Sequence, residues 1–308
     1  MSTFTAAAPH LTRVAVAPAT PAGRAYADAR VAEFPSQPSL NMQNFGGKTL
    51  EHLMVTNVYI GTWDATDREH LDHSLTAAMQ DAGLNNVLAQ YFDGRRPTTA
   101  FRDSRVIDGP LPQRAYKSFV EARIPWLGAQ DEVVCLCLPR GVVLVDGEEG
   151  DDGADSQHGL GGYHGSVHTP EGTMYYAVSV YAERGNGIDA FDAPWKNTCA
   201  ILYHELCEVR TDPDVEDAIR AGHDPHALDL LGWYSPQGGE IGDIPMELAG
   251  VNIHEVMQEV ALADGSGTVP VQLMWSNAVG GPEGPVKRRR QPRAGSSSAA
   301  ARAGTPPS

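Results

Sequence analysis

The chain alternates between short segments rich in β-branched and aromatic residues and longer segments with helical periodicity. The first such pair is a strand candidate at residues 53–60, followed by apolar residues at helical spacing over residues 66–82. Further along come three strand candidates and a second helix, at residues 133–138, 142–145, 173–181 and 197–210. This alternation predicts the α/β (α+β) class, with a mixed sheet packed by helices.

Turn and cap signals indicate where these elements begin and end. Thr66 and Glu69 form a capping-box pattern at the start of the first helix, and Gly83 is expected to close it. Asn197 or Thr198 can cap the second helix. Two further features are expected beyond it, a short helical excursion at residues 214–231 and a hairpin formed by residues 256–262 and 269–275.

The two ends of the chain differ in composition from the middle. Residues 1–45 are rich in Ala, Pro, Ser and Thr and lack periodicity, so a flexible N-terminal arm is expected there. Residues 281–308 are expected to form a disordered basic tail, because such a composition buries too little apolar surface to offset its ordering entropy. Residues 46–280 are therefore expected to form one folded domain.

The formal net charge is −16, although the tail from Gly281 carries six basic residues and one acid. An acidic body argues against nucleic acid as the main partner, since phosphate binding needs a basic surface. No apolar run reaches the length of about 18 residues that a membrane span needs. No secretory signal is visible, and a cytoplasmic location with buried, reduced thiols is expected for the four cysteines, Cys135, Cys137, Cys199 and Cys207.

The segment that carries chemistry is HELCE, which begins at His204 within the second predicted helix. His204 and Glu208 are four residues apart, so on a helix they project from one face and can reach one ion. Glu205 lies beside that pair, and the equivalent glutamate of His-Glu-x-x-His enzymes is a general base. One imidazole with carboxylates predicts a divalent metal, with zinc first and manganese or calcium as alternatives. Chance occurrence of this short motif on a solvated helix face is the structural alternative.

A third ligand has to come from elsewhere in the chain, and the glycine-rich segment at residues 232–243 is the best candidate. Glycines allow the backbone to approach closely, and two carboxylates lie in this segment. Asp243 is the first choice as ligand and Glu240 the second. Tyr234 is a candidate hydrogen-bond donor to an oxyanion, although a turn with core-packed aromatic residues would have the same pattern.

His164 is flanked by glycines in the sequence GGYHGSVH, which predicts a tight backbone near a site. It is a candidate ligand, proton carrier or oxyanion donor, because imidazole titrates near neutrality. A hydrogen-bonded structural histidine is the alternative. His168 is a weaker candidate, and His223 and His226 are expected at the surface.

The wider pattern resembles bacterial relatives of the Exordium (phosphate-induced protein) family over residues 50–280. The motifs are HEL-x-E-x-x-TDP from residue 204, GWY from 232, GEIGD from 239 and WSN from 275, with GYH from 162 and G-x-W from 61. The resemblance implies a compact α/β domain, zincin-like around the helix and often secreted, which is the alternative location. In zincin-like enzymes an edge strand aligns an extended peptide, and residues 173–181 are expected to be such a strand. Ile244-Pro245 departs from the family, which often has a cysteine there.

These observations lead to a metal-dependent, peptidase-like hydrolase in which His204, Glu208 and Asp243 hold the ion. Glu205 is the expected base, and Tyr234 or His164 the expected oxyanion donor. One alternative is a non-catalytic binding or signalling domain with a structural ion or none. Another is a partner-binding scaffold that uses the basic tail.

Overall fold

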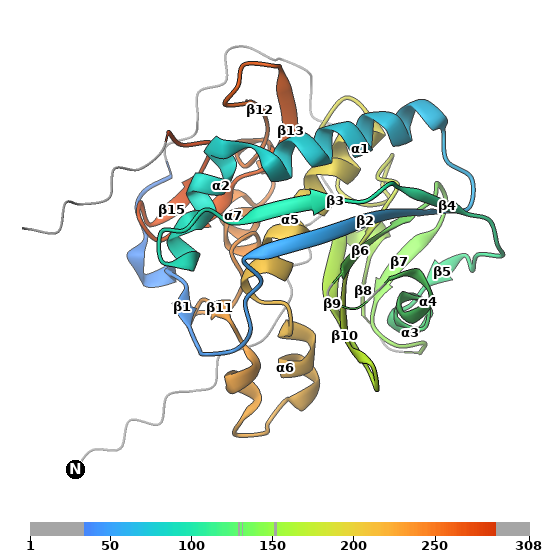
Figure 1. Cartoon of the computed structure of the whole chain (residues 1–308), viewed down its shortest axis with the longest axis horizontal. Coiled ribbons are helices and arrows are strands. Elements are labelled where there is room, and N and C mark those ends of the chain that lie inside the picture. Colours follow the sequence, from blue (N-terminus) through green and yellow to red (C-terminus); the bar gives the residue numbers. More distant parts are fainter. Residues whose placement is uncertain (1–33, 129, 131, 151–152, 288–308) are drawn as a thin grey trace, which may run out of the picture.

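The computed structural model describes residues 34–128, 130, 132–150 and 153–287. Its centre is a six-stranded sheet in the order β3-β2-β6-β10-β9, with β4 pairing with β2 beyond the end of β3 (Figure 1). The strands are β2 (His52–Ile60), β3 (Thr98–Phe101), β4 (Arg105–Ile107), β6 (Glu132–Leu138), β9 (Gly162–Thr169) and β10 (Gly172–Val180). The mixed α/β class expected from the sequence is confirmed, and the strands at residues 53–60, 133–138 and 173–181 are present.

One strand of this sheet runs against the others. The pairs β2–β3, β2–β4, β2–β6 and β6–β10 are parallel, whereas β9 pairs antiparallel with β10. A tight turn between Thr169 and Gly172 reverses the chain and leaves β9 at the edge. The expectation that residues 173–181 form the edge strand is therefore wrong, because β10 lies between β6 and β9.

Side chains alternate between the two covered faces of the sheet, as the period of a strand requires. Tyr59, Cys135 and Ala177 belong to one apolar cluster, and Val58, Leu136 and Val178 belong to the other. Both faces are buried, which explains why the central strands read as nearly continuous apolar runs.

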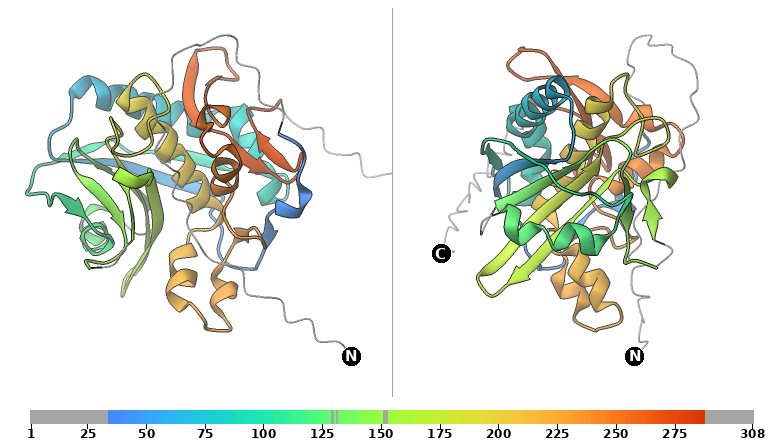
Figure 2. Two further views of the ribbon diagram at one scale, coloured as in Figure 1. Left: turned by 180° about the vertical axis from the view of Figure 1, so that it is seen from behind. Right: turned by 90° about the vertical axis from the view of Figure 1, so that its right-hand side faces the viewer.

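Helices cover each face. The first face packs against α1 (Ala65–Gln80) and α5 (Pro194–Thr211), and the second against α3 (Lys117–Glu121) and α4 (Ile124–Leu127) (Figures 1 and 2). A small sheet lies beside α3 and α4, built from β5 (Arg114–Ala115), β7 (Val143–Asp146) and β8 (Ala154–Asp155). The helix α5 is thus buried along most of its length.

The last third of the chain wraps around α5. The predicted hairpin is present as β12 (Met257–Ala261) and β13 (Thr268–Gln272), and β13 packs against α5. The predicted helical excursion is α6 (Val215–Ala221) followed by the 3-10 turn η4 (Ala227–Leu230). The remaining elements are α7 (Asp243–Ala249), η5 (Ile253–Glu255), and the paired strands β14 (Met274–Ser276) and β15 (Gly281–Glu283).

The helix starts differ from those expected. Asp64, not Thr66, caps α1, and its carboxylate accepts the N–H groups of Thr66 and Asp67. Gly83 does not end the helical region, because Asp81 caps a further helix, α2 (Ala82–Leu88), followed by η2 (Ala89–Phe92). The helix α5 begins at Pro194, whose fixed φ suits the first turn. The Asp64 carboxylate and Pro194 mark these two helix starts in place of the expected caps at Thr66 and at Asn197 or Thr198.

The folded body extends past both expected boundaries. The strand β1 (Gln43–Asn44) pairs with β11 (Trp233–Tyr234), and the 3-10 turn η1 (Pro38–Leu40) precedes it. Met42 is buried in the main core. At the other end, β15 and the bond from Val286 N–H to the Gly83 carbonyl hold residues that were expected in the tail. The other arm residues, 1–33 and 288–308, lie outside the described part of the chain.

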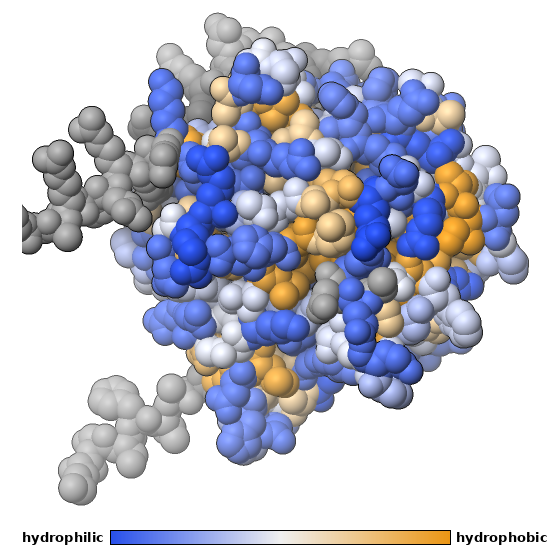
Figure 3. Space-filling model, viewed as in Figure 1, coloured by the Kyte–Doolittle hydropathy of each residue, from blue (hydrophilic) through white to orange (hydrophobic). Residues whose placement is uncertain are grey.

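The exposed surface is mostly hydrophilic and the four thiols are buried, as the composition led us to expect. Hydrophilic residues dominate the face in Figure 3, with smaller apolar patches between them. Cys135, Cys137, Cys199 and Cys207 are buried and unpaired, as expected. None of the helices in the described residues combines the length and apolar character needed to cross a membrane.

Candidate metal centre

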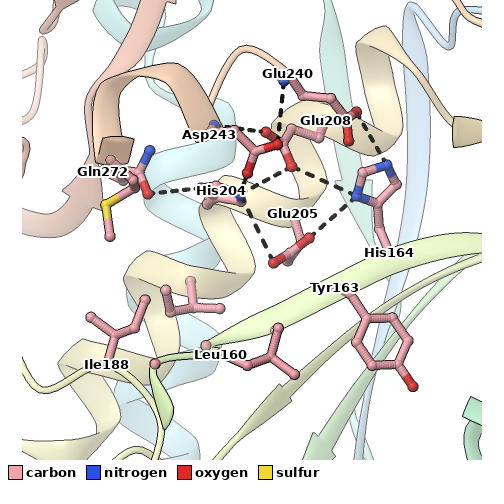
Figure 4. A pocket seen from close by; sticks show the side chains of 15 residues that line it. Leu160, Tyr163, His164, Ile188, His204, Glu205, Glu208, Glu240, Asp243 and Gln272 are labelled. Atoms are coloured by element: carbon pink, nitrogen blue, oxygen red, sulfur yellow. Dashed lines mark hydrogen bonds and ion pairs between the residues drawn. The ribbon is translucent and has the colours of Figure 1, made fainter. Parts of the chain in front are cut away.

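The helix α5 presents His204, Glu205 and Glu208 to one pocket (Figure 4). The four-residue spacing places the His204 Nε2 atom 3.0 Å from Glu208 Oε2. The Glu205 carboxylate lies beside the pair, with Oε1 4.0 Å from His204 Nε2. The pairing predicted from the helical spacing is therefore present, and the alternative of a solvated acidic face is wrong, because both glutamates are buried.

A glutamine on the β12–β13 hairpin fixes the orientation of the His204 ring. Gln272 on β13 donates its Nε2–H to the Gly242 carbonyl at 2.6 Å, which turns its Oε1 toward His204 Nδ1 at 2.7 Å. Because an amide oxygen only accepts, His204 Nδ1 carries the proton in the neutral ring. The lone pair of Nε2 then points at Glu208 and Asp243, as a metal ligand requires.

The glycine-rich segment passes directly over these side chains. Glu208 Oε1 accepts the backbone N–H groups of Gly242 and Asp243 at 2.9 and 3.2 Å. A Cβ on Gly242 would lie 2.5 Å from His204 Nδ1, so only glycine fits there. This approach brings Asp243 Oδ1 to 3.8 Å from His204 Nε2. Asp243, the first choice for a third ligand, is thus close enough to share an ion with His204 and Glu208.

His164 enters the pocket from the edge strand β9, and it is 2% exposed. Its Nε2 lies 3.1 Å from the Asp212 carbonyl and 3.5 Å from Glu240 Oε1. Its Nδ1 lies 3.2 Å from Glu205 Oε2 and 3.7 Å from Glu208 Oε2. Glu240, the second choice as ligand, therefore belongs to the His164 side of the pocket.

The pocket encloses a free volume of about 50 Å³ and is partly open to solvent. Its polar lining consists mainly of four carboxylates and two imidazoles, and its apolar wall contains Leu160, Ile188, Ile201 and Met246. No lysine or arginine is among the described residues that line it. Buried carboxylates are costly unless a proton or a cation compensates them, so this lining favours a cation.

Two pKa shifts report the negative field of the pocket. Burial alone would lower the pKa of His204, but the charges of Glu208 and Glu205 outweigh it and raise the pKa well above its usual value. Burial, together with repulsion from Glu208, raises the pKa of Asp243 to about 7. A field that favours a proton on imidazole and opposes ionisation of a carboxyl group also attracts a metal ion.

The donor set fits a divalent metal. His204, Glu208 and Asp243 each offer a ligand atom within 4.8 Å of the others, and so do His164, Glu208 and Glu240. Tetrahedral bonds of about 2.0–2.2 Å separate two ligand atoms by about 3.4 Å. The distances of 3.0 and 3.8 Å from His204 Nε2 to its two neighbours bracket that value.

Several other residues considered from the sequence lie elsewhere. Tyr234 does not line the pocket; its ring packs with Val215, Ala218 and Leu231. This burial matches the core-packed alternative for its segment. Three further histidines are exposed, as expected for two of them: His168, His223 and His226.

Sequence reasoning missed Gln272 and the Asp212 carbonyl. Both act through hydrogen bonds to a histidine, and Gln272 is distant from its partner in the chain. The TDP motif that ends α5 was a partial signal for Asp212. A glutamine within a strand has no such signal.

None of the protein-family models matches the chain, and neither the curated proteins nor the solved structures contain a significant match.

Proposed function

We propose that this protein is a metal-dependent hydrolase that acts on peptides. The observation that carries the proposal is the convergence of His204, Glu208 and Asp243 around one point, with Glu205 beside them. These three side chains would hold the ion, with zinc as the first expectation and manganese or calcium as alternatives. A divalent ion there polarises a carbonyl oxygen and lowers the pKa of a water molecule.

Glu205 is the proposed general base. It adjoins the ligand set without being one of the three ligand residues, and it has a second contact, with His164 Nδ1 at 3.2 Å. The Glu205 carboxylate is one of the groups that line the pocket. A buried carboxylate in this position can take a proton from an attacking water and deliver it to the leaving amine.

The edge strand supports a peptide as substrate. In the described residues no strand pairs with the outer side of β9, and His164 on this strand lines the pocket. An extended peptide that adds to β9 would run past the ligand set. A single antiparallel edge strand beside the metal-bearing helix is also what the proposed zincin-like domain requires.

The proposal is tested by metal analysis and by one substitution. Purified protein should contain a divalent metal, and His204→Ala should bind less of it than the wild-type protein does. Glu205→Gln should keep the metal and reduce cleavage of a peptide library, followed by mass spectrometry, by about 100-fold or more. Glu247→Gln is the matched control, because Glu247 is exposed on α7. Full activity in Glu205→Gln would remove the proposed base.

A structural ion is the second candidate, favoured by the low exposure of the site. The side chains of Glu205 and Glu208 are only 5% and 3% exposed, and that of Asp243 is 18% exposed. In that case wild-type protein would bind the metal and gain stability from it, yet cleave no peptide in the library. Peptide cleavage by the metal-loaded wild-type protein therefore distinguishes a catalytic ion from a structural one.

A further inference from the structure

His164 presents a lone pair, not a proton, to the pocket when its ring is neutral. The Asp212 carbonyl, 3.1 Å from Nε2, can only accept a hydrogen bond, so Nε2 carries the proton. Nδ1 then faces Glu205 Oε2 and Glu208 Oε2 at 3.2 and 3.7 Å. Three electron-rich atoms that face one another require a proton or a metal ion between them.

Glu208 lies between the two histidines. Its Oε1 is occupied by the N–H groups of Gly242 and Asp243, which fixes the direction of the carboxylate. Its Oε2 is 3.0 Å from His204 Nε2 and 3.7 Å from His164 Nδ1. The Oε2 atom of Glu208 therefore lies near both imidazoles, one on α5 and the other on β9.

The charge of the pocket also favours a cation beside His164. The carboxylates of Glu205, Glu208, Glu240 and Asp243 line it without a lysine or arginine in the described lining. A second divalent cation in this pocket would be surrounded by carboxylate oxygen atoms, which are suitable ligands for it. Both imidazoles stay neutral in such an arrangement, as their hydrogen bonds to Gln272 and Asp212 allow.

We infer that the pocket binds a second divalent cation through His164, Glu208 and Glu240, and that Glu208 bridges the two ions. The ligand atoms of these three residues lie within 4.8 Å of one another. This inference rests on the proposed function for the first ion, and it assigns His164 as a ligand. Paired cations that share a ligand are a known arrangement in aminopeptidases and phosphatases.

The wild-type protein provides the first test. Protein stripped with a chelator is titrated with Mn²⁺, and bound metal is counted by elemental analysis after gel filtration. We expect two ions per chain and an electron paramagnetic resonance spectrum of two coupled Mn²⁺ ions. One ion per chain, or two uncoupled ions, would overturn the inference and leave the hydrolase proposal standing. No bound ion would overturn both.

Substitutions then locate the second ion. His164→Ala and Glu240→Gln should each bind one ion and lose the coupled signal, while His73→Ala and Glu247→Gln, both at exposed positions, should bind two. A separate group, His168, Asp214 and Asp217, could also hold a cation near the surface. Loss of the second ion in Asp217→Asn, with retention in His164→Ala, would show that it binds there and refute the inference. His204→Ala should likewise bind only one ion, and retention of two ions by this variant would contradict the proposed function instead.

Discussion

At the scale of single residues, the candidate site depends on hydrogen bonds that decide which nitrogen of each histidine carries a proton. Gln272 and the Asp212 carbonyl accept from His204 Nδ1 and His164 Nε2, so the opposite nitrogens face the carboxylates. Outer partners of this kind set the tautomer and the orientation of a ligand before any ion arrives. These hydrogen bonds direct the unprotonated nitrogen of each imidazole toward the carboxylates of the pocket.

Gln272→Leu should weaken metal binding while leaving the fold intact. The substitution removes the acceptor that fixes the His204 ring, and loss of such a partner costs about 10- to 100-fold in metal affinity. The measurement is the Kd for Mn²⁺ or Zn²⁺ by isothermal titration calorimetry. Gln258→Leu, on the partner strand β12 and only half-buried, is the control. An unchanged Kd in Gln272→Leu would show that the ring needs no such support.

At the scale of elements, α5 is held at its C-terminal end by a buried arginine. Arg210 donates from Nη1 to the carbonyls of Glu51 and Thr98, and from Nη2 to Thr99 Oγ1. These acceptors lie just before β2 and within β3, so the helix that carries the candidate ligands is tied to the sheet. Burial lowers the pKa of Arg210 to about 10, which still leaves it charged at neutral pH.

Arg210→Met should destabilise the protein by about 3 kcal/mol or more, because it leaves buried acceptors unpaired. Chemical denaturation with urea measures the free energy of unfolding. Arg95→Met is the matched control, since Arg95 is exposed and bonds to the Glu51 carboxylate. That exposed pair should contribute little to the free energy of unfolding, because solvent screens it. Equal losses for the two variants would contradict the proposed anchoring role of Arg210.

At the scale of the whole molecule, elements distant in the chain meet at one pocket. Ligand candidates come from α5, from β9 and from the segment that leads into α7, and the hairpin strand β13 supplies Gln272. The pocket therefore forms only when the sheet and the last third of the chain are both in place. Metal binding and global stability should accordingly be linked.

Stability of the metal-free protein should fall as pH rises from about 4 to about 7. The pKa of Asp243 is raised from 3.8 to about 7, and burial raises that of Asp212 equally. In this range the folded state binds more protons than the unfolded state, so stability declines with rising pH. The raised pKa of His204 extends the decline above its usual value of 6.5.

With saturating metal the slope should reverse, because the ligands must be deprotonated to bind. We expect Tm measured with a chelator to fall by about 5 °C or more across this range, and Tm measured with excess Zn²⁺ or Mn²⁺ to rise. Asp243→Asn should flatten the decline seen with a chelator. If Tm measured with a chelator rises toward pH 7, the pKa values of these carboxyl groups are not raised in the folded protein.

Local sequence patterns were sufficient for the elements and for part of the site. The strands β2, β6 and β10, the helix α5 and the hairpin follow from period and composition, because each depends on neighbours in the chain. The helix spacing likewise paired His204 with Glu208. The exact caps were less predictable, since Asp64 and Thr66 compete for the same first turn.

The sequence by itself determined which side chains α5 places on one face. It also indicated that the glycine-rich segment would bring a carboxylate close to them. Both are short-range properties of backbone geometry. Tertiary structure alone decided that β9 is the edge strand, that Tyr234 is packed away, and that His164 and Glu240 share Glu208 with His204. These outcomes depend on contacts between residues tens of positions apart. Burial and charge in the assembled pocket set such contacts, and no local pattern encodes them.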